Sequence, residues 1–263
     1  MGKRCSLRTN LSGLMLTGRS SPITRPAKIV SPANTREVVL DSPSSSPITP
    51  GGRWQPAPRH APFVIGVIVV AVVMVWLTGM GQSNFAAAMM IVDPRPFSWD
   101  TFSTLAGRLE ALSITLSGGQ VWRLLTPDFL HFSWTHIIFN SVMLWFLGSQ
   151  IEWMDGRARL VGLFLATSLA SNLLQYLVSG PLFGGLSGVV YGILGYCWLS
   201  QRRLPRFQFP PALVTFALVW MIIGFTPVPE MIGVGRMANE AHLGGFLAGL
   251  AMAAIMPPRR YRR

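Results

Sequence analysis

The chain has 263 residues, of which half are apolar and only 12% are charged. Its mean hydropathy is positive, at +0.43, which excludes an ordinary soluble composition. The formal net charge of +12 would favour a nucleic-acid partner in a soluble protein, so the placement of the charges decides what it means. The two cysteines, Cys5 and Cys197, lie far apart in the sequence, and neither a disulfide framework nor a metal site is expected.

Residues 1–60 differ in character from the rest of the chain. They are basic, rich in Ser and Pro and almost without aromatic residues, a composition that predicts a disordered tail. Two targeting signals remain as alternatives. The segment before Glu37 is basic and free of acids, as in an organellar transit peptide, and Met1-Gly2 followed by Ser6 fits a myristoylation pattern.

Five long intervals beyond this tail contain no Lys, Arg, Asp or Glu. A membrane-spanning helix needs about 20 apolar residues, and the interval from Leu160 to Gln201 has room for two, with a turn at Ser179-Gly180-Pro181. The uncharged stretch Ala111 to Trp122 is too short to cross and is expected to be an interfacial or re-entrant part of a long first loop. The sequence therefore predicts an all-α, polytopic membrane domain over residues 61–256 with six spans, near 62–80, 132–151, 160–178, 184–201, 210–227 and 239–256. Residues 257–263 follow as a second basic tail.

Lys and Arg are divided unequally between the two sides of these spans. With six spans both termini share one side, which has 18 basic residues, whereas the other side has four, Arg95, Arg108, Arg123 and Arg236. The positive-inside rule then places both termini in the cytoplasm, and no nucleic-acid partner is expected. Because no further span precedes or follows the six, we expect a bacterial inner membrane, with an organellar membrane as the alternative.

Several polar side chains are expected at a similar depth. The second, fourth and sixth spans all enter from the non-cytoplasmic side, and near their entry ends are His131, His136, Asn140, Ser187 and His242. A helix rises about 1.5 Å per residue, so these groups lie within a few turns of one membrane face. Because polar groups inside a span are costly, they indicate a functional site.

Each of these residues also has a structural interpretation. Ser187 belongs to a Gly-x-Ser-Gly tetrapeptide, which is weak evidence alone. Gly188 with Gly192, and Gly245 with Gly249, form Gly-x-x-x-Gly steps typical of helix packing. Gly185 is expected to serve helix packing as well. Close packing and catalysis are compatible, because close helices are what a serine and a histidine need to share a proton. His136 and Asn140, on one helix face, could instead form an interhelical hydrogen bond.

Three sequence blocks carry these residues, in this order: His131-Phe-Ser-Trp-Thr-His136-Ile-Ile-Phe-Asn140, Gly185-Leu-Ser187-Gly188-Val-Val-Tyr191-Gly192 and Ala241-His242-Leu-Gly-Gly245-Phe-Leu-Ala-Gly249. Together they resemble the motif blocks of the rhomboid intramembrane serine proteases. Trp122-Arg123 resembles the tryptophan-arginine pair in the first loop of that family. The resemblance covers about residues 120–256, and Ala61 onward supplies the expected first helix.

The resemblance implies a six-helix rhomboid-like bundle and a serine endopeptidase that cuts in or near the transmembrane segments of other proteins. Ser187 would be the nucleophile and His242 its general base, a dyad without an acid. Asn140, His136 and the Ser187 backbone N–H would bind the oxyanion. Tyr191 would support the His242 ring.

Other consequences of the resemblance concern the surroundings of the site. His131 is expected either to line the site or to hold the junction between loop and helix. Substrates would enter near the fifth span and beneath the loop Thr226 to Ala238. The expected partners are transmembrane substrates and the lipid bilayer, no cofactor or metal is implied, and the oligomeric state is left open.

Competing chemistries lack their residues. The chain has no His-Glu-x-x-His motif for a zinc protease and no Asp after Asp155 for a paired-aspartate protease. A transporter or channel would use polar groups along a whole pathway, but here they are confined to one third of the membrane. A non-proteolytic rhomboid-like protein that binds or extracts transmembrane clients remains the alternative. Such relatives lack the catalytic pair, whereas this chain has both members.

Overall fold

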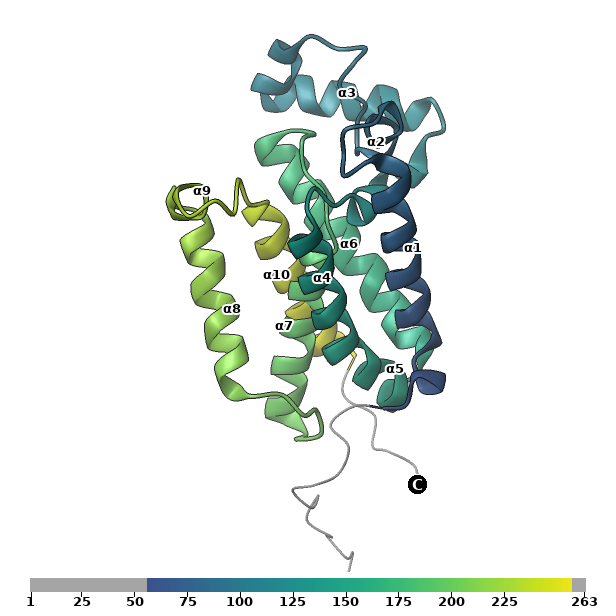
Figure 1. Ribbon diagram of the computed structural model, residues 1–263, viewed down its shortest axis with the longest axis vertical. Coiled ribbons are helices and arrows are strands. Elements are labelled where there is room, and N and C mark those ends of the chain that lie inside the picture. Colours follow the sequence, from purple (N-terminus) through teal and green to yellow (C-terminus); the bar gives the residue numbers. More distant parts are fainter. Residues whose placement is uncertain (1–55, 257–263) are drawn as a thin grey trace, which may run out of the picture. The chain divides into compact units, whose positions relative to one another are not determined.

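The computed structural model describes residues 56–256, which are helical with no β-strand in that range (Figure 1). The expected disordered tail, apart from residues 56–60, and the basic tail at 257–263 lie outside the described residues. Residues Pro58–His60 form a 3₁₀ turn, η1, directly before the first long helix.

Long helices occupy all six segments that the sequence singles out. Five are single α-helices, α1 (Pro62–Thr78), α6 (Arg157–Ser179), α7 (Ser187–Arg203), α8 (Pro211–Gly224) and α10 (Asn239–Ile255). Judged by length and composition alone, α6 is the one described helix that is long and apolar enough to cross a membrane. The helices α1 and α8 are also apolar but shorter.

The remaining long helix is a composite. It comprises α4 (Trp134–Met143), a π-helical turn η5 (Leu144–Gly148) and α5 (Ser149–Asp155). The Ser133 hydroxyl accepts a hydrogen bond from the His136 backbone N–H at 3.2 Å and so caps the start of α4. The helix continues past the predicted end at 151 because the carboxylate of Glu152 accepts from the N–H groups of Phe63 and Val64, both at 3.0 Å. Glu152 thereby caps α1.

Short helices fill the long first loop. They are α2 (Asn84–Met89), η2 (Trp99–Ser103), α3 (Leu105–Ser117), η3 (Val121–Leu124) and η4 (Thr126–Phe129). In Figure 1, α3 runs crosswise to the long helices at one end of them. It covers part of the stretch expected to be interfacial but starts earlier, because the Thr104 side chain caps it by accepting from the Gly107 N–H at 3.1 Å.

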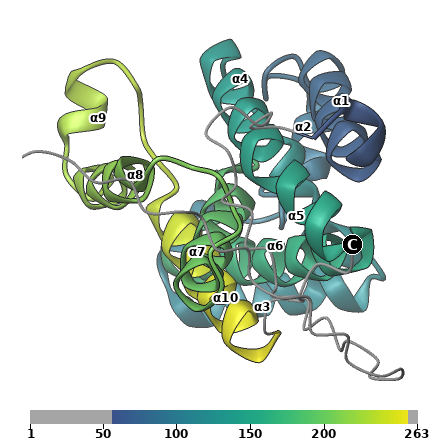
Figure 2. The same ribbon diagram turned by 90° about the horizontal axis from the view of Figure 1, so that it is seen from below.

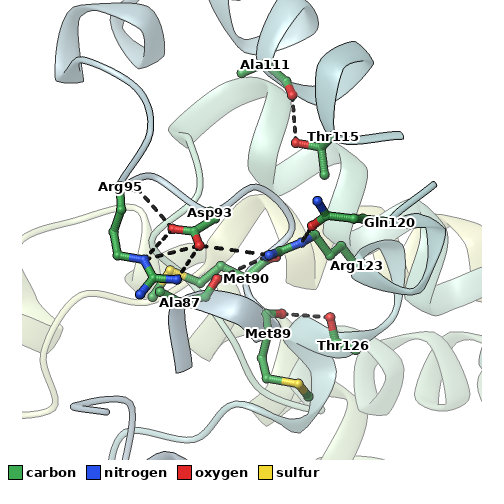
Figure 3. Close-up of polar contacts among 10 residues, drawn as sticks. All are labelled: Ala87, Met89, Met90, Asp93, Arg95, Ala111, Thr115, Gln120, Arg123 and Thr126. Carbon is green, nitrogen blue, oxygen red and sulfur yellow. Dashed lines mark hydrogen bonds and ion pairs between the residues drawn. The ribbon is translucent and has the colours of Figure 1, made fainter. Parts of the chain in front are cut away.

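Arg123 organises this loop from a buried position (Figure 3). Its guanidinium donates to the carbonyls of Ala87 at 3.1 Å and Met90 at 2.8 Å, which ties η3 to the end of α2. Asp93 lies 4.0 Å from Arg123 and is paired with Arg95. Hydrogen bonds from Arg95 hold the pKa of Asp93 below its usual value. Polar contacts therefore fix the first loop. The Trp122-Arg123 pair in the sequence does not by itself show which groups Arg123 contacts.

The helices α7 and α10 pack against each other, and α10 also packs against α6. Viewed from below, α8 and α9 (Val228–Met231) lie on one side of this pair, and α1 and α2 lie on the other (Figure 2). A methyl group on Gly245 would overlap the carbonyl oxygen of Gly188, and one on Gly249 would overlap that of Gly192. The two Gly-x-x-x-Gly steps therefore face each other across one interface.

Candidate active site

A cavity of about 1620 Å³ opens between α4, α7, α8 and α10 beneath the loop that joins α8 to α10. The polar groups singled out by the sequence line it, namely His136, Asn140, Ser187 and His242. Most of the remaining lining is apolar, with aromatic side chains such as Phe139, Phe216 and Trp220. A polar cluster at the wall of an apolar cavity is the usual form of a binding or catalytic site.

Ser187 and His242 meet across the interface of α7 and α10. The Oγ of Ser187 lies 2.9 Å from Nε2 of His242. Ser187 is the first residue of α7, so its backbone N–H is one of those without an intrahelical acceptor. The positive end of the helix dipole also favours negative charge at this position. The geometry suits proton transfer from the hydroxyl to the imidazole.

Tyr191 holds the imidazole from one side. Its ring stacks on that of His242, with centroids 4.6 Å apart and planes inclined by 24°. The Tyr191 hydroxyl donates to the carbonyl of Ala217 in α8 at 2.9 Å, which fixes the tyrosine ring in turn. The Nδ1 atom of His242 is buried and has no hydrogen-bond partner among residues 56–256. Stacking, and no carboxylate of the described chain, orients this histidine.

His131 links the first loop to α7 and lies away from the cavity, whose lining does not include it. It is fully buried, and its Nε2 lies 3.2 Å from Asn140 Nδ2 and 3.4 Å from the backbone N of Leu186. Its Nδ1 faces the carbonyl of Phe129 at 3.4 Å. A neutral ring with its proton on Nδ1 satisfies all three contacts. Of the two expected roles, the geometry favours the one at the loop-to-helix junction.

Asn140 and His136 project from the same face of α4 toward the start of α7. One amide hydrogen of Asn140 is directed to His131, which leaves the second for another acceptor. The ring of His136 lies edge-on to that of His131, with centroids 4.9 Å apart. The structure thus gathers Asn140, His136 and the start of α7 at one point.

Gly185 differs from the other glycines that the sequence grouped with helix packing. It precedes α7 with a φ of +120°, a conformation that favours glycine. A methyl group there would lie 2.7 Å from Nε2 of His136 and 3.5 Å from Nδ2 of Asn140. Gly185 therefore lets the loop pass close to these two side chains and takes no part in the α7–α10 interface.

Sequence analysis missed a polar stripe on α6. Ser168, Ser171, Asn172 and Gln175 are all buried, and their spacing places them on one helix face. The Gln175 side-chain oxygen accepts from the backbone N–H of Ala241 at 3.0 Å, next to His242. The helical spacing of four polar residues in a span was the available signal. Within residues 56–256 no three His, Cys, Asp or Glu side chains are grouped to hold a metal.

Residues 118–259 match the family model of the rhomboid domain, which is more than half of the chain. The chain belongs to the rhomboid family. It is 42% identical over 136 residues to the rhomboid protease GlpG of Serratia proteamaculans (strain 568), covering 51% of this chain and 48% of that protein. It is 41% identical over 138 residues to the rhomboid protease GlpG of Salmonella choleraesuis (strain SC-B67), covering 52% and 49%. The chain thus spans about half the length of the curated relatives it matches.

Proposed function

We propose that this protein is an intramembrane serine endopeptidase that hydrolyses peptide bonds in or near the transmembrane segments of other membrane proteins. The observation that carries the proposal is the 2.9 Å contact between Ser187 Oγ and His242 Nε2 at the wall of the cavity. Membership of the rhomboid family and the similarity to two proteins named rhomboid proteases support it.

In this mechanism Nε2 of His242 takes the hydroxyl proton as Ser187 Oγ attacks the substrate carbonyl carbon. The oxyanion forms beside the start of α7, where the Ser187 backbone N–H, the second amide hydrogen of Asn140 and His136 donate to it. The protonated His242 then gives its proton to the leaving amine. A water molecule repeats the sequence on the acyl-enzyme, and Ser187 regains its proton.

The apolar surroundings of the site support a membrane setting. We infer that the six long helices cross the membrane and that both termini are cytoplasmic, as the distribution of basic residues predicts. Short helices remain compatible with this topology because the hydrocarbon core tolerates local thinning and polar ends. The bacterial relatives support a location in the inner membrane.

Substrate entry is best placed between α8 and α4. In α8 only Val214 and Met221 are buried, so this helix is held less firmly than α7 or α10. The aromatic side chains Phe139 and Phe216 are more than half exposed and line the cavity between these helices. The loop above contains Met231, 79% exposed, and no buried apolar residue beyond Pro229. An apolar transmembrane segment is therefore the substrate class that this opening suits.

Incubating purified protein with a generic transmembrane substrate in liposomes tests the proposal. Wild type should release a fragment that is visible on a gel, and Ser187→Ala should release none. Cleavage by Ser187→Ala would assign the activity to another residue or to a contaminant. A folded wild-type protein that binds the substrate and leaves it uncut would favour the non-proteolytic alternative.

A further inference from the structure

Asp128 is a fully buried carboxyl group in the first loop that the proposed mechanism does not use. It belongs to η4 and is absent from the lining of the cavity. Its Oδ1 accepts from Asn172 Nδ2 at 3.0 Å, and its Oδ2 accepts from the Ser168 hydroxyl. Asn172 also donates to the carbonyl of Leu124 at 3.0 Å. These contacts fix η3 and η4 to α6.

The residue before Asp128 touches the loop that leads to the nucleophile. The carbonyl of Pro127 accepts from the backbone N–H of Gly185 at 2.9 Å. A methyl group on the neighbouring Gly184 would lie 3.1 Å from the same carbonyl oxygen and 2.9 Å from that of Leu130. The segment 127–130 therefore sets the position of Gly184 and Gly185, and through them the entry to α7.

Helix α6, whose Ser168 and Asn172 bind Asp128, also supports the start of α7. A methyl group on Gly188, next to Ser187, would lie 2.6 Å from Oγ of Ser171, and the Ser171 hydroxyl donates to the carbonyl of Ser168 at 3.0 Å. Ser168 and Asn172 thus fix η4 to α6 within one turn of the residue against which the nucleophile helix packs. The segment η4 and the start of α7 therefore both contact α6.

We propose that Asp128, held by Ser168 and Asn172, is a positioning residue that keeps the Pro127 carbonyl on Gly185 and so fixes the oxyanion site around Asn140, His136 and the Ser187 N–H. The proposal rests on the function proposed above. Its chemical logic is that buried carboxyl oxygens are costly unless hydrogen-bonded, so the three side chains stay together. A displacement of about 1 Å near a reacting group can lower turnover about 100-fold.

The test compares Asp128→Leu with Asp128→Asn. Leucine accepts no hydrogen bond, whereas asparagine keeps an oxygen for Asn172 and can donate to Ser168. Asp128→Leu should lower kcat about 10- to 100-fold with little change in KM, and Asp128→Asn should restore kcat to within about threefold of wild type. Ser168→Ala, which removes one of the two donors, is a milder second variant and should fall between them. Tyr176→Phe is the matched control, since the Tyr176 hydroxyl ties α6 to α3 by donating to the Arg108 carbonyl at 2.7 Å, away from Gly185.

Two further measurements separate positioning from loss of fold and from loss of function. The end point of labelling by a fluorophosphonate counts active molecules, and it should be unchanged in Asp128→Leu while the rate of labelling falls. Hydrogen exchange in residues 183–190 needs no activity, and it should become about tenfold faster in Asp128→Leu but not in Tyr176→Phe.

Exchange and kcat at wild-type values in a folded Asp128→Leu protein would overturn the proposed role of Asp128 and leave the protease intact. Faster exchange in a protein whose wild type cleaves nothing would instead support the positioning role and overturn the proposed function. The two failures are therefore distinguishable.

Discussion

The hydroxyl of Ser187 on α7 lies 2.9 Å from Nε2 of His242 on α10, and the ring of Tyr191 stacks on the imidazole of His242. Tyr191 and Ser187 stand one helical turn apart on the same helix, so α7 supplies both the proposed nucleophile and the ring that supports the proposed base. Nδ1 of His242 is unpartnered in residues 56–256, so in the proposed dyad the stack with Tyr191 would take the place that an acid has in a triad.

The first prediction is that a fluorophosphonate labels Ser187 and that His242 controls the rate. Wild type should be labelled, Ser187→Ala should not, and His242→Ala should react about 100-fold or more slowly, because a serine hydroxyl without a base is a weak nucleophile. Mass spectrometry of the adduct locates the label. Ser141, Ser168 and Ser171 act as internal controls. An adduct on one of them, or wild-type rates in His242→Ala, would show the dyad assignment to be wrong.

The second prediction concerns Tyr191 and follows from the stack. Tyr191→Phe keeps the ring but loses the bond to the Ala217 carbonyl, and Tyr191→Ala removes the ring. Phenylalanine should retain most of the labelling rate, whereas alanine should lower it by about tenfold or more, because His242 loses the surface that orients it. Labelling kinetics with a fluorophosphonate measure both. Equal rates in wild type and Tyr191→Ala would mean that the helix backbone alone orients the histidine.

The third prediction assigns a donor to Asn140. Asn140→Ala should lower kcat about 10- to 1000-fold while the protein remains folded, because a donor already aimed at the oxyanion is lost. The adjacent Ser141→Ala is the matched control, since the buried Ser141 hydroxyl has no hydrogen-bond partner within the described residues. Turnover with a transmembrane substrate and thermal unfolding are measured side by side. Unchanged kcat in folded Asn140→Ala would reassign its amide to the contact with His131.

The long helices could be predicted because intervals without charge reveal them directly. The end of the second span could not, because the charged residues that close its interval are paired with groups on other elements. Asp155 continues α5 past the expected end of the second span, since its carboxylate pairs with Arg206 at 2.6 Å and accepts from the Tyr196 hydroxyl at 2.9 Å. A rule that stops spans at charges misses such pairs.

The candidate site, like the helices, could be predicted in part from the sequence. Ser187, His242 and Asn140 stood at one expected depth, and the structure brings all three to one cavity. Asp128 was not recognised, because its partners Ser168 and Asn172 are 40 and 44 residues away and a loop carboxylate is ordinarily solvated. The position of Gly185 could not be predicted either, because its φ depends on a contact with Pro127 that no local pattern encodes.

The fourth prediction is the topology. Reporter fusions after residue 60 and at residue 263 should both report cytoplasm, because the side that holds the termini has 18 basic residues against four. A fusion after Gly119, in the first loop, is the control and should report the opposite side. A periplasmic signal from either terminal fusion would overturn the orientation, and with it the shared depth of the polar groups.

The last prediction tests whether the close packing of α7 and α10 maintains the contact between Ser187 and His242. Gly245→Ala places a methyl group on the carbonyl of Gly188 and Gly249→Ala places one on that of Gly192, so each should cost about 1–3 kcal/mol of stability through overpacking. Gly162→Ala in α6 is the control. A methyl group there meets no heavy atom within 4 Å, so that variant should be neutral or more stable by about 0.5–1 kcal/mol.

Gly245→Ala and Gly249→Ala should each lower both the stability and the labelling rate. Gly162→Ala should lower neither. Separation of the helices at Gly245 lengthens the contact between Ser187 and His242, one turn away, so Gly245→Ala should slow labelling by a fluorophosphonate more than Gly249→Ala, which lies a turn further along α10. Thermal unfolding and labelling rates on the same samples provide the comparison. Wild-type stability in Gly245→Ala would show that the interface can open at no cost. Slower labelling in Gly249→Ala than in Gly245→Ala would show that reactivity does not follow the local distance between the helices.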